Sequence, residues 1–443
     1  MQRVGRLIVC VVIFVTGCGT SPEPIPTGAV PDPTAVSPGE LLERYQQANA
    51  AYEAGEVARF CTLTEALTEA WPDHPRLLFN LARCRVLEGN ADDALDLLDR
   101  LITMRVAIDP TEDEDLMALR ELPRFSVLMD RYEAAIEPTT VSEVAFRLDD
   151  EEFVPEDVAW DPLSGDLFIS SIRQRKIVRI DDRGRQTAFA GYPEIDMYAA
   201  LSMAVDSDRR WLWLTTAATP SMIDFRAGEH EGRSELLGFD LDNGRLLVRV
   251  AAPADGDQHE LNDLAIDADG AVLVGDAPVG AVYRLSPGAD TFETIVAPGS
   301  MFSPQGIVIL PDSGQTLIAD YSRGLCLLRS DGGVQVLKSP PDAWLGGIDG
   351  LSVVGRRDLI AVQNGITPNR VVRVRLTENV EGIEAVDVLD LAHPEHDQPT
   401  LGEVVDGDFL YVANSLWGAW DRDGNLVEGR KLSSPVILRI SLR

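Results

Sequence analysis

One pattern of short apolar segments and turns is repeated six times along the chain, and it limits the fold more than any other feature. Its clearest copy is 261–286 (LNDLAIDADGAVLVGDAPVGAVYRLS), where 264–266, 271–275 and 281–285 have the composition and length of strands. The Asp-Ala-Asp-Gly at 267–270 has the composition of a hairpin turn. The other copies are 157–181, 201–241, 305–329, 349–376 and 401–442.

The spacing of the copies is typical of propeller blades, which repeat every 40 to 50 residues or so. Comparable positions, 43 to 60 residues apart, are held by Asp157, Ser202, Asn262, Gln305, Asp349 and Gly402. In the first five copies a fourth strand follows the third, at 187–190, 246–250, 292–296, 334–337 and 385–389. The sixth copy ends at Arg443 without one, and the strand-like run 142–148 is left over before the first copy.

Placing 142–148 as the outer strand of the last blade gives six four-stranded sheets. It also closes the ring and covers two edges that would otherwise be open to aggregation. The sequence therefore predicts a mainly β protein, with a six-bladed β-propeller over residues 141–443.

The first 17 residues have the features of a secretory signal, with Arg3 and Arg6 before a short apolar run at 7–15. The segment ends in Val-Thr-Gly before Cys18, which resembles a bacterial lipobox, whose cysteine becomes lipidated. The Pro-rich stretch 18–39 then has the composition of a semi-rigid tether. We expect Cys18 to anchor the protein in a bacterial cell envelope, facing the periplasm or the exterior. The alternative is a plain signal peptide with an incidental cysteine.

Acidic residues outnumber basic residues by 72 to 39, which gives a formal charge of −33 at pH 7. So acidic a chain is a poor partner for nucleic acid or for anionic lipid. We therefore expect no nucleic acid partner, and contact with the membrane only through the lipid anchor. The charge also favours the attraction of cations.

Between residues 40 and 137 the strand pattern is absent and apolar residues recur at helical spacing. Gly55 and Gly89 are 34 residues apart, as are Leu41 and Pro75. Further packing positions at this period are Ala48, Leu67 and Pro72 in one unit and Leu78, Leu81, Ala82, Ala94, Leu98 and Leu101 in the next. This segment resembles the tetratricopeptide family, with two degenerate repeats and a capping pair of helices at 113–122 and 124–136. We predict an N-terminal all-α domain over 40–137.

Tetratricopeptide arrays present a concave surface, so the resemblance implies a protein or peptide partner on the helical repeats. The alternative is a rigid spacer. The resemblance also places Cys61 and Cys84 on neighbouring helices, where an oxidising compartment permits a disulfide; the alternative is two buried free thiols. Cys326, in an apolar strand, is expected to serve packing, and no cysteine pair has zinc-site spacing.

In a propeller, the residues just before each innermost strand surround one mouth of the central channel. Here they are rich in carboxylates and amides: Glu156, Asp157, Ser202, Glu260, Asn262, Asp263, Ser303, Gln305, Asp349 and Glu403. Such oxygen atoms are the ligands of hard cations, and Ca²⁺ takes six to eight of them or so in irregular geometry. Carboxylates held this close repel one another unless a cation binds or some are protonated. We expect one divalent cation, with Ca²⁺ as the first choice.

Four of these entry motifs resemble those of the gluconolactonase/regucalcin family: PEDVAWD at 155–161, LND at 261–263, SPQG at 303–306 and IDGL at 348–351. The resemblance runs from residue 141 to the C-terminus and implies a metal-dependent hydrolase. By motif position it implies that Glu156, Gln305 and Asp349 hold the metal, and that Asp349 is also the general base. Asn262 matches a residue that lines the substrate site. Two departures are Gln305 in place of Asn, and Glu260 where sugar-lactone hydrolases often carry Arg.

His259 and Glu260 are expected near the substrate, with His259 either as a proton shuttle or as a hydrogen-bonded structural residue. An insertion at 216–235 is expected to overhang the mouth as a lid. The leading hypothesis is the metal-dependent hydrolysis of lactones or related esters, with a small-molecule ligand at the mouth. The alternative is a non-catalytic binding propeller whose helical repeats recruit a partner.

Overall fold

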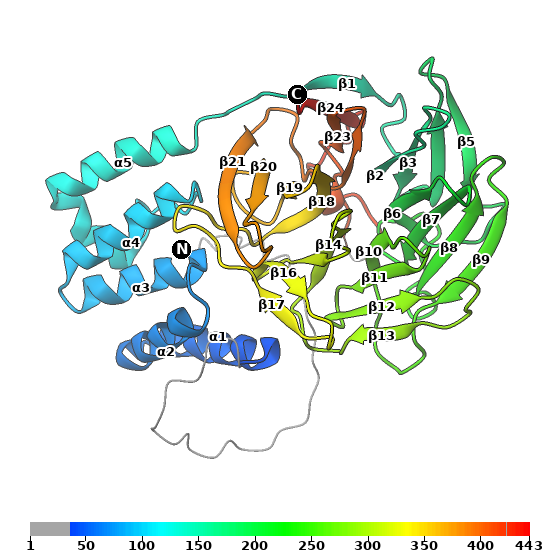
Figure 1. Cartoon of the computed structure of the whole chain (residues 1–443). Coiled ribbons are helices and arrows are strands. Elements are labelled where there is room, and N and C mark those ends of the chain that lie inside the picture. Colours follow the sequence, from blue (N-terminus) through cyan, green and yellow to red (C-terminus); the bar gives the residue numbers. More distant parts are fainter. Residues whose placement is uncertain (1–35, 422) are drawn as a thin grey trace.

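The computed structural model describes residues 36–421 and 423–443. The predicted signal peptide at 1–17, the predicted lipidation site Cys18 and most of the predicted tether lie outside the described residues. Within them, helices as far as residue 135 are followed by strands from residue 143 onward (Figure 1). None of the described helices combines the length and the apolar character that crossing a membrane requires.

The helical region begins with two hairpins, α1 (Pro38–Glu53) with α2 (Val57–Ala70), and α3 (Pro75–Leu87) with α4 (Ala91–Thr103). The first helix of each hairpin ends before a glycine with positive φ, Gly55 at 72° and Gly89 at 84°. This left-handed conformation strains other residues and is typical of helix C-termini. The 34-residue repeat of glycine is therefore a repeat of helix ends.

A 3₁₀ helix, η1 (Glu114–Glu121), and α5 (Pro123–Ala135) complete the helical region. The segment 113–122 is thus not the α-helix expected from the sequence. Leu122 is extended, at φ −89° and ψ 128°, because a residue before proline is disfavoured in the helical conformation. The Asp113 side chain accepts a hydrogen bond from Asp115 N at the start of η1, at 3.1 Å. Between these two stops the chain forms the tighter helix.

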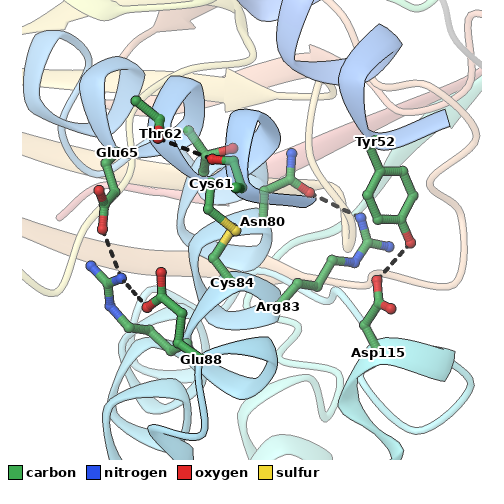
Figure 2. The surroundings of a disulfide bond; sticks show 12 residues. Tyr52, Cys61, Thr62, Glu65, Asn80, Arg83, Cys84, Glu88 and Asp115 are labelled. Carbon is green, nitrogen blue, oxygen red and sulfur yellow. Dashed lines mark hydrogen bonds and ion pairs between the residues drawn. A yellow bond between two sulfur atoms is a disulfide. The ribbon is translucent and has the colours of Figure 1, made fainter. Parts of the chain in front are cut away.

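Cys61 of α2 and Cys84 of α3 form a disulfide, and both are buried (Figure 2). The bridge that the sequence leaves open is therefore present, and it joins the two hairpins. Beside it, Tyr52 of α1 donates a hydrogen bond to Asp115 Oδ2 at 2.7 Å (Figure 2). This contact ties η1 to the first hairpin.

Six four-stranded antiparallel sheets form the propeller, which confirms the predicted fold class. Blades 1 to 3 are β2 (Pro155–Trp160), β3 (Leu167–Ser171), β4 (Lys176–Ile180), β5 (Gln186–Gly191); β6 (Ala199–Asp206), β7 (Trp211–Ala217), β8 (Ser234–Asp240), β9 (Leu246–Ala251); and β10 (Leu261–Ile266), β11 (Val272–Asp276), β12 (Ala281–Leu285), β13 (Glu293–Val296). Blades 4 and 5 are β14 (Pro304–Ile309), β15 (Thr316–Asp320), β16 (Gly324–Leu328), β17 (Val334–Val336); and β18 (Ile348–Val354), β19 (Asp358–Gln363), β20 (Arg370–Leu376), β21 (Ile383–Leu391). The first strand of each lies toward the centre of the ring (Figure 1).

Blade 6 joins the two ends of the propeller sequence. It consists of β22 (Gly402–Val405), β23 (Asp408–Val412), β24 (Val436–Ser441) and β1 (Glu143–Arg147). The segment expected to close the ring thus forms β1, and it pairs antiparallel with β24 through Glu143 and Arg439. Apolar clusters fill the space between neighbouring blades. Cys326 is a buried thiol within the cluster between blades 3 and 4.

The helical region packs on loops of blades 4 and 5, and the helices lie beside these blades in Figure 1. Trp71 stacks on Phe302, with ring centroids 4.9 Å apart and an interplanar angle of 17°. Trp344 and Ile366, which belong to blade 5, are buried members of the apolar core of α3, α4 and α5. Phe302 and Trp344 precede the inner strands β14 and β18, and Ile366 follows β19. The helices therefore border the mouth of the propeller.

Candidate functional site

In five blades, the pairing between the first and the second strand is irregular at the start of the first strand. The candidate site residues lie in these irregular segments. The register between first and second strands shifts within 155–158, 200–203, 261–264, 304–307 and 348–350. A bulge of this kind re-aims the side chains of the residues that it contains. Four bulge residues with oxygen-bearing side chains are called the mouth set: Glu156, Asn262, Gln305 and Asp349.

In blades 1, 2 and 3, another polar residue of the bulge bonds to a neighbouring blade. Asp157 accepts a hydrogen bond from Met203 N of blade 2 at 2.7 Å. Asp263 accepts one from Ile307 N of blade 4 at 2.8 Å, and Ser202 Oγ donates to Asp263 Oδ1 at 2.6 Å. We call Asp157, Ser202 and Asp263 the inter-blade set, because each bonds to a neighbouring blade. Their oxygens are used in holding blades 1 to 4 together.

The mouth set is only partly satisfied by the protein. Glu156 Oε2 accepts a hydrogen bond from Trp417 Nε1 at 2.7 Å, and Asp349 Oδ2 accepts one from Asn364 Nδ2 at 2.6 Å. Asn262 Nδ2 donates to Pro304 O at 2.8 Å and to Gln305 Oε1. Asn262 Oδ1 is buried and has no hydrogen-bond partner in the described chain.

Three oxygens from three blades are therefore left without a donor among the described residues: Glu156 Oε1, Asn262 Oδ1 and Asp349 Oδ1. Gln305, which the family resemblance assigns to the metal, instead points its amide oxygen at Asn262 and donates to Ser303 Oγ at 3.0 Å. In this arrangement Gln305 orients Asn262, and Asn262 supplies the free amide oxygen.

Burial and mutual repulsion disfavour ionisation of the mouth carboxylates. Burial raises the pKa of Asp349 to about 7, with Asp263 and Glu260 adding to the rise and the Asn364 hydrogen bond opposing it. The pKa of Glu156 lies well above its usual range because of burial and the charge of Asp349, and the Trp417 hydrogen bond lowers it. The charge of Asp349 therefore acts on the ionisation of Glu156.

Further carboxylates of the channel share this property. Burial raises the pKa of Glu403 to about 7 and that of Asp263 to about 6. Burial, followed by the charge of Asp276, raises the pKa of Glu260 to about 6. The pKa of Asp157 also lies well above its usual range, chiefly through burial. A bound cation would stabilise the ionised form of these carboxyl groups, so a cluster of carboxyl groups with raised pKa values favours cation binding.

Both ring nitrogens of His259 lie within hydrogen-bond distance of carboxylates. Its Nδ1 lies 2.6 Å from Asp276 Oδ2 and its Nε2 lies 3.0 Å from Asp255 Oδ1. The hydrogen bond with Asp276 is the main cause that raises the pKa of His259 to about 9. Neither ring nitrogen is left to shuttle a proton, and the structure favours the structural alternative for this residue.

The structure adds two residues that sequence reasoning does not place at the site. Asn364 directly follows β19, and its Oδ1 accepts a hydrogen bond from Tyr321 OH at 2.8 Å, which fixes its amide toward Asp349. Trp417 lies in the β23–β24 connection, far from Glu156 in sequence. The only sequence signals for these two site residues are an Asn directly after a strand and a Trp in a long loop, and both are common outside functional sites.

The predicted lid forms a loop on the same side as Trp417. Since β7 ends at Ala217 and β8 begins at Ser234, the loop itself is 218–233, slightly shorter than the predicted insertion. Its Met222 packs in one apolar cluster with Leu201 of the blade 2 bulge and with Trp417. The lid loop and the β23–β24 connection thus form an apolar wall beside the mouth set.

The described residues contain no cluster of three or more His, Cys, Asp or Glu side chains arranged to hold a metal ion. The candidate ligands are fewer: two carboxylates and one unpartnered amide oxygen. These are hard oxygen donors, and they fit a cation such as Ca²⁺ that completes its coordination with water or substrate. The orphaned Asn262 oxygen supports this fit, because buried polar atoms normally have a partner.

No protein-family model matches the sequence, and no curated protein matches it. Solved structures with a similar fold include a calcium-binding protein, regucalcin, from Agrobacterium tumefaciens, with 17% identity, a TM-score of 0.47 and coverage of 68% of this chain and 95% of that chain. A gluconolactonase from Xanthomonas campestris has 16% identity, a TM-score of 0.42 and coverage of 68% and 93%. The PQQ-bound aldose sugar dehydrogenase from Streptomyces coelicolor has 14% identity, a TM-score of 0.46 and coverage of 68% and 97%. At these identities the likeness concerns the fold alone.

Proposed function

We propose that the mouth set binds one divalent cation, with Ca²⁺ as the first choice, and that the propeller hydrolyses lactones or related esters there. The observation that carries this proposal is that Glu156 Oε1, Asn262 Oδ1 and Asp349 Oδ1 at the entries of three blades have no donor in the described chain, and that the charge of Asp349 acts on Glu156. Leaving a buried amide oxygen unpaired costs about 1–3 kcal/mol. A ligand at this point would remove that cost.

The proposed ligands are thus Glu156, Asn262 and Asp349, with Gln305 behind them as the residue that orients Asn262. A bound divalent cation would supply Lewis-acid polarisation of a carbonyl or phosphoryl oxygen. The choice of Ca²⁺ follows from the ligand type, since carboxylate and amide oxygens in irregular geometry suit it. The excess of negative charge at the mouth supports the same choice.

Asp349 is the residue that we propose as general base. Its Oδ2 is held by Asn364, so the proton of an attacking water would go to Oδ1, the oxygen that we also propose as a cation ligand. Without a cation, burial raises the pKa of Asp349 to about 7, and the charge of a bound cation would lower it, so the carboxylate would be ionised at neutral pH and able to accept a proton. Trp417 holds Glu156 Oε2, which keeps the other oxygen of this carboxylate directed at the mouth. The lid loop and Trp417 would limit the access of bulk water.

One observation favours a second candidate, a non-catalytic binding propeller. Each carboxylate of the mouth set already accepts one hydrogen bond from the protein, and Asn262 and Gln305 bond to each other. Such a mouth can also hold a small molecule by hydrogen bonds without a metal. In this case the helical repeats would serve to bind a protein or peptide partner.

We further propose that Cys18 carries a lipid that anchors the protein in a bacterial envelope, and that the membrane is contacted through this anchor alone. The signal-like 1–17 and the Pro-rich 18–39 support this. Labelling of growing cells with a radioactive fatty acid tests it. Loss of the label and release of the protein in Cys18→Ser is the expected result, and an unlabelled wild-type chain contradicts it.

The test of the main proposal is a calcium titration by calorimetry, followed by a screen of lactones and esters. Asp349→Asn should abolish both calcium binding and hydrolysis. Asp206→Asn is the matched control, because Asp206 ends β6 at the opposite face of the propeller and is also buried. Absence of divalent cation binding in the wild type would leave the second candidate. Hydrolysis that persists in Asp349→Asn would remove Asp349 as the base.

A further inference from the structure

The helical region is joined to the propeller through the loop that carries Asn364. This loop, residues 364–369 between β19 and β20, is called the seam loop. Ala107 N, beyond α4, donates a hydrogen bond to Thr367 O at 2.7 Å. Ile366, at 8% exposure, packs in the apolar core of α3, α4 and α5. The seam loop is therefore held from the helical side by both backbone and side-chain contacts.

Arg370, at the end of the seam loop, binds three parts of the chain together. Its guanidinium donates to Met104 O at 2.8 Å, to Trp344 O at 2.8 Å and to Gln363 Oε1 at 2.6 Å. These acceptors belong to the helical region, to the entry of blade 5 and to the end of β19. The Arg370 side chain therefore links the helical region to blade 5 at the seam loop.

The environment of Arg370 is costly unless the helical region is docked. The side chain is 2% exposed, and its acceptors in the described chain are two carbonyl oxygens and one amide oxygen, with no carboxylate among them. Burial, and then the charge of Arg105, lower the pKa of Arg370 to about 10, so the group stays charged at neutral pH. An unpaired buried charge must be satisfied by hydrogen bonds. Since Met104 supplies one of the three acceptors, separation of the domains would leave the guanidinium short of a partner.

From the seam loop, a short series of hydrogen bonds leads to the mouth. Asn369 Nδ2 donates to Asn364 O at 3.0 Å and to Ile366 O at 2.9 Å, which makes the seam loop rigid. Asn364 Nδ2 donates to Asp349 Oδ2 at 2.6 Å and to Pro399 O at 3.0 Å. Movement of the seam loop therefore displaces the donor that orients Asp349.

We propose that the helical region is a working part of the propeller mouth: Arg370 and the seam loop position Asn364, and Asn364 positions the carboxylate of Asp349. Asn364 and Arg370 are thus positioning residues, and the helical region is more than a spacer or a separate binding module. This inference rests on the proposed function in that Asp349 is taken as a cation ligand. The geometry of the mouth should accordingly depend on the docking of the helices.

Arg370→Met and Arg175→Met form a matched pair for the test. Arg175 is also 2% exposed, lies in the corresponding loop of blade 1, and bonds Met197 O at 2.6 Å, but its partners all belong to the propeller. Two quantities are measured on the full-length protein: amide hydrogen exchange without calcium, and the Kd for calcium. Arg370→Lys, which keeps the charge, is included as the conservative variant.

In Arg370→Met, we expect amide exchange at 364–369 and at 348–352 to become faster by about tenfold, with strands of blades 1 to 3 unchanged. The Kd for calcium should rise about 10- to 100-fold, as is typical when a residue that supports a metal ligand is lost. Arg175→Met should leave exchange at 348–352 and the Kd unchanged. Arg370→Lys should restore part of the affinity.

Faster exchange confined to 364–369, with 348–352 and the Kd unchanged, would overturn the inference. If the wild type binds no cation, the proposed function fails, while exchange at 348–352 still decides whether the helices position Asp349. If Arg370→Met does not fold, Ile366→Ala takes its place, because it removes only an apolar contact with the helical core. The same faster exchange at 348–352 is expected of that variant, and its absence counts against the inference.

Discussion

Glu156 and Asp157 are neighbours in one bulge, and both are buried carboxylates, yet the protein treats them differently. Both oxygens of Asp157 accept backbone hydrogen bonds, from Val158 N at 2.7 Å and from Met203 N at 2.7 Å. Glu156 accepts one, from Trp417, and its second oxygen has no donor among the described residues. Both oxygens of Asp157 are therefore occupied by the protein, whereas Glu156 keeps one oxygen that can bind a ligand.

The same contrast recurs in blade 3, between Asn262 and Asp263. Asp263 accepts hydrogen bonds from Ser202 Oγ, Leu264 N and Ile307 N. Asn262 Oδ1 has no hydrogen-bond partner within 36–421 and 423–443. In both pairs, the hydrogen-bond partners therefore distinguish a residue that joins blades from an adjacent residue that keeps a free oxygen. The inter-blade set should control stability, and the mouth set should control binding.

The largest effect is expected for Asp263→Ala, which breaks this comparison on the structural side. It leaves the backbone N–H groups of Leu264 and Ile307 without their side-chain acceptor and removes the shorter of the two hydrogen bonds that Ser202 Oγ donates. We expect the free energy of unfolding to fall by about 3–5 kcal/mol, measured by urea denaturation. Asn262→Ala is the control, with an expected loss below about 1 kcal/mol. Equal losses in the two variants would mean that the inter-blade set is not structural.

Glu156→Gln breaks the comparison on the binding side. The variant keeps the shape of the side chain and removes the charge that faces Asp349, so the Kd for calcium should rise at least about 100-fold. The free energy of unfolding without calcium should stay the same or increase, because repulsion with Asp349 is relieved. Asp157→Asn should do the reverse, with a near wild-type Kd and a loss of about 1–2 kcal/mol in stability. Calorimetry and urea denaturation measure the two quantities.

The stability of the calcium-free protein should fall as pH rises from about 4 to about 7. Burial raises the pKa of Asp349 and of Glu403 to about 7. In this window the folded state therefore holds protons that the unfolded chain has already released, and stability declines with pH. His259, with a raised pKa of about 9, contributes stability that is complete below its unfolded pKa of 6.5, so it does not disturb the lower part of the window.

Calcium at a hundredfold excess over its Kd should restore roughly 2.7 kcal/mol at neutral pH. Thermal unfolding between these pH values, with and without calcium, measures both effects. Asp349→Asn should show a weaker pH dependence and no response to calcium. A melting temperature that is constant over the window in the wild type would contradict the raised pKa values.

The sequence is sufficient to predict the fold, because each blade repeats its own signals at short range. Asp267, for example, accepts hydrogen bonds from Asp269 N and Ala271 N, both at 2.9 Å, and Gly270 has φ 85°, as the Asp-Gly turn requires. The count of strands also predicts the closing segment that forms β1. The 3₁₀ helix η1 is missed because Pro123 acts on Leu122, and a periodic pattern does not include this effect.

The site is predictable only as far as the entry of each blade. Within the predicted set, Asn262 bonds to Gln305, and the charge of Asp349 acts on Glu156. Which of two adjacent residues keeps a free oxygen depends on the backbone of the neighbouring blade, and spacing along the chain does not show it. Asn364 is missed for the same reason, since it reaches Asp349 only through the pairing of β18 with β19.

The smallest effect is expected for Trp417→Phe, and it tests how finely the mouth carboxylates are adjusted. The variant keeps an aromatic ring in the apolar wall but removes the N–H that bonds Glu156 Oε2. Because this bond lowers the pKa of Glu156 against the larger effect of burial, its loss leaves less of the carboxylate ionised at neutral pH. We expect the Kd for calcium to rise about threefold to tenfold, or about 0.7–1.4 kcal/mol.

Trp420→Phe is the matched control, since Trp420 Nε1 has no hydrogen-bond partner in the described chain and its ring packs under Arg173. The same change of ring at this position should leave the Kd unaltered. Tighter calcium binding in Trp417→Phe would contradict the prediction in an informative way. It would mean that the indole competes with the cation for Glu156, so that the β23–β24 connection closes the mouth and must move before a ligand enters.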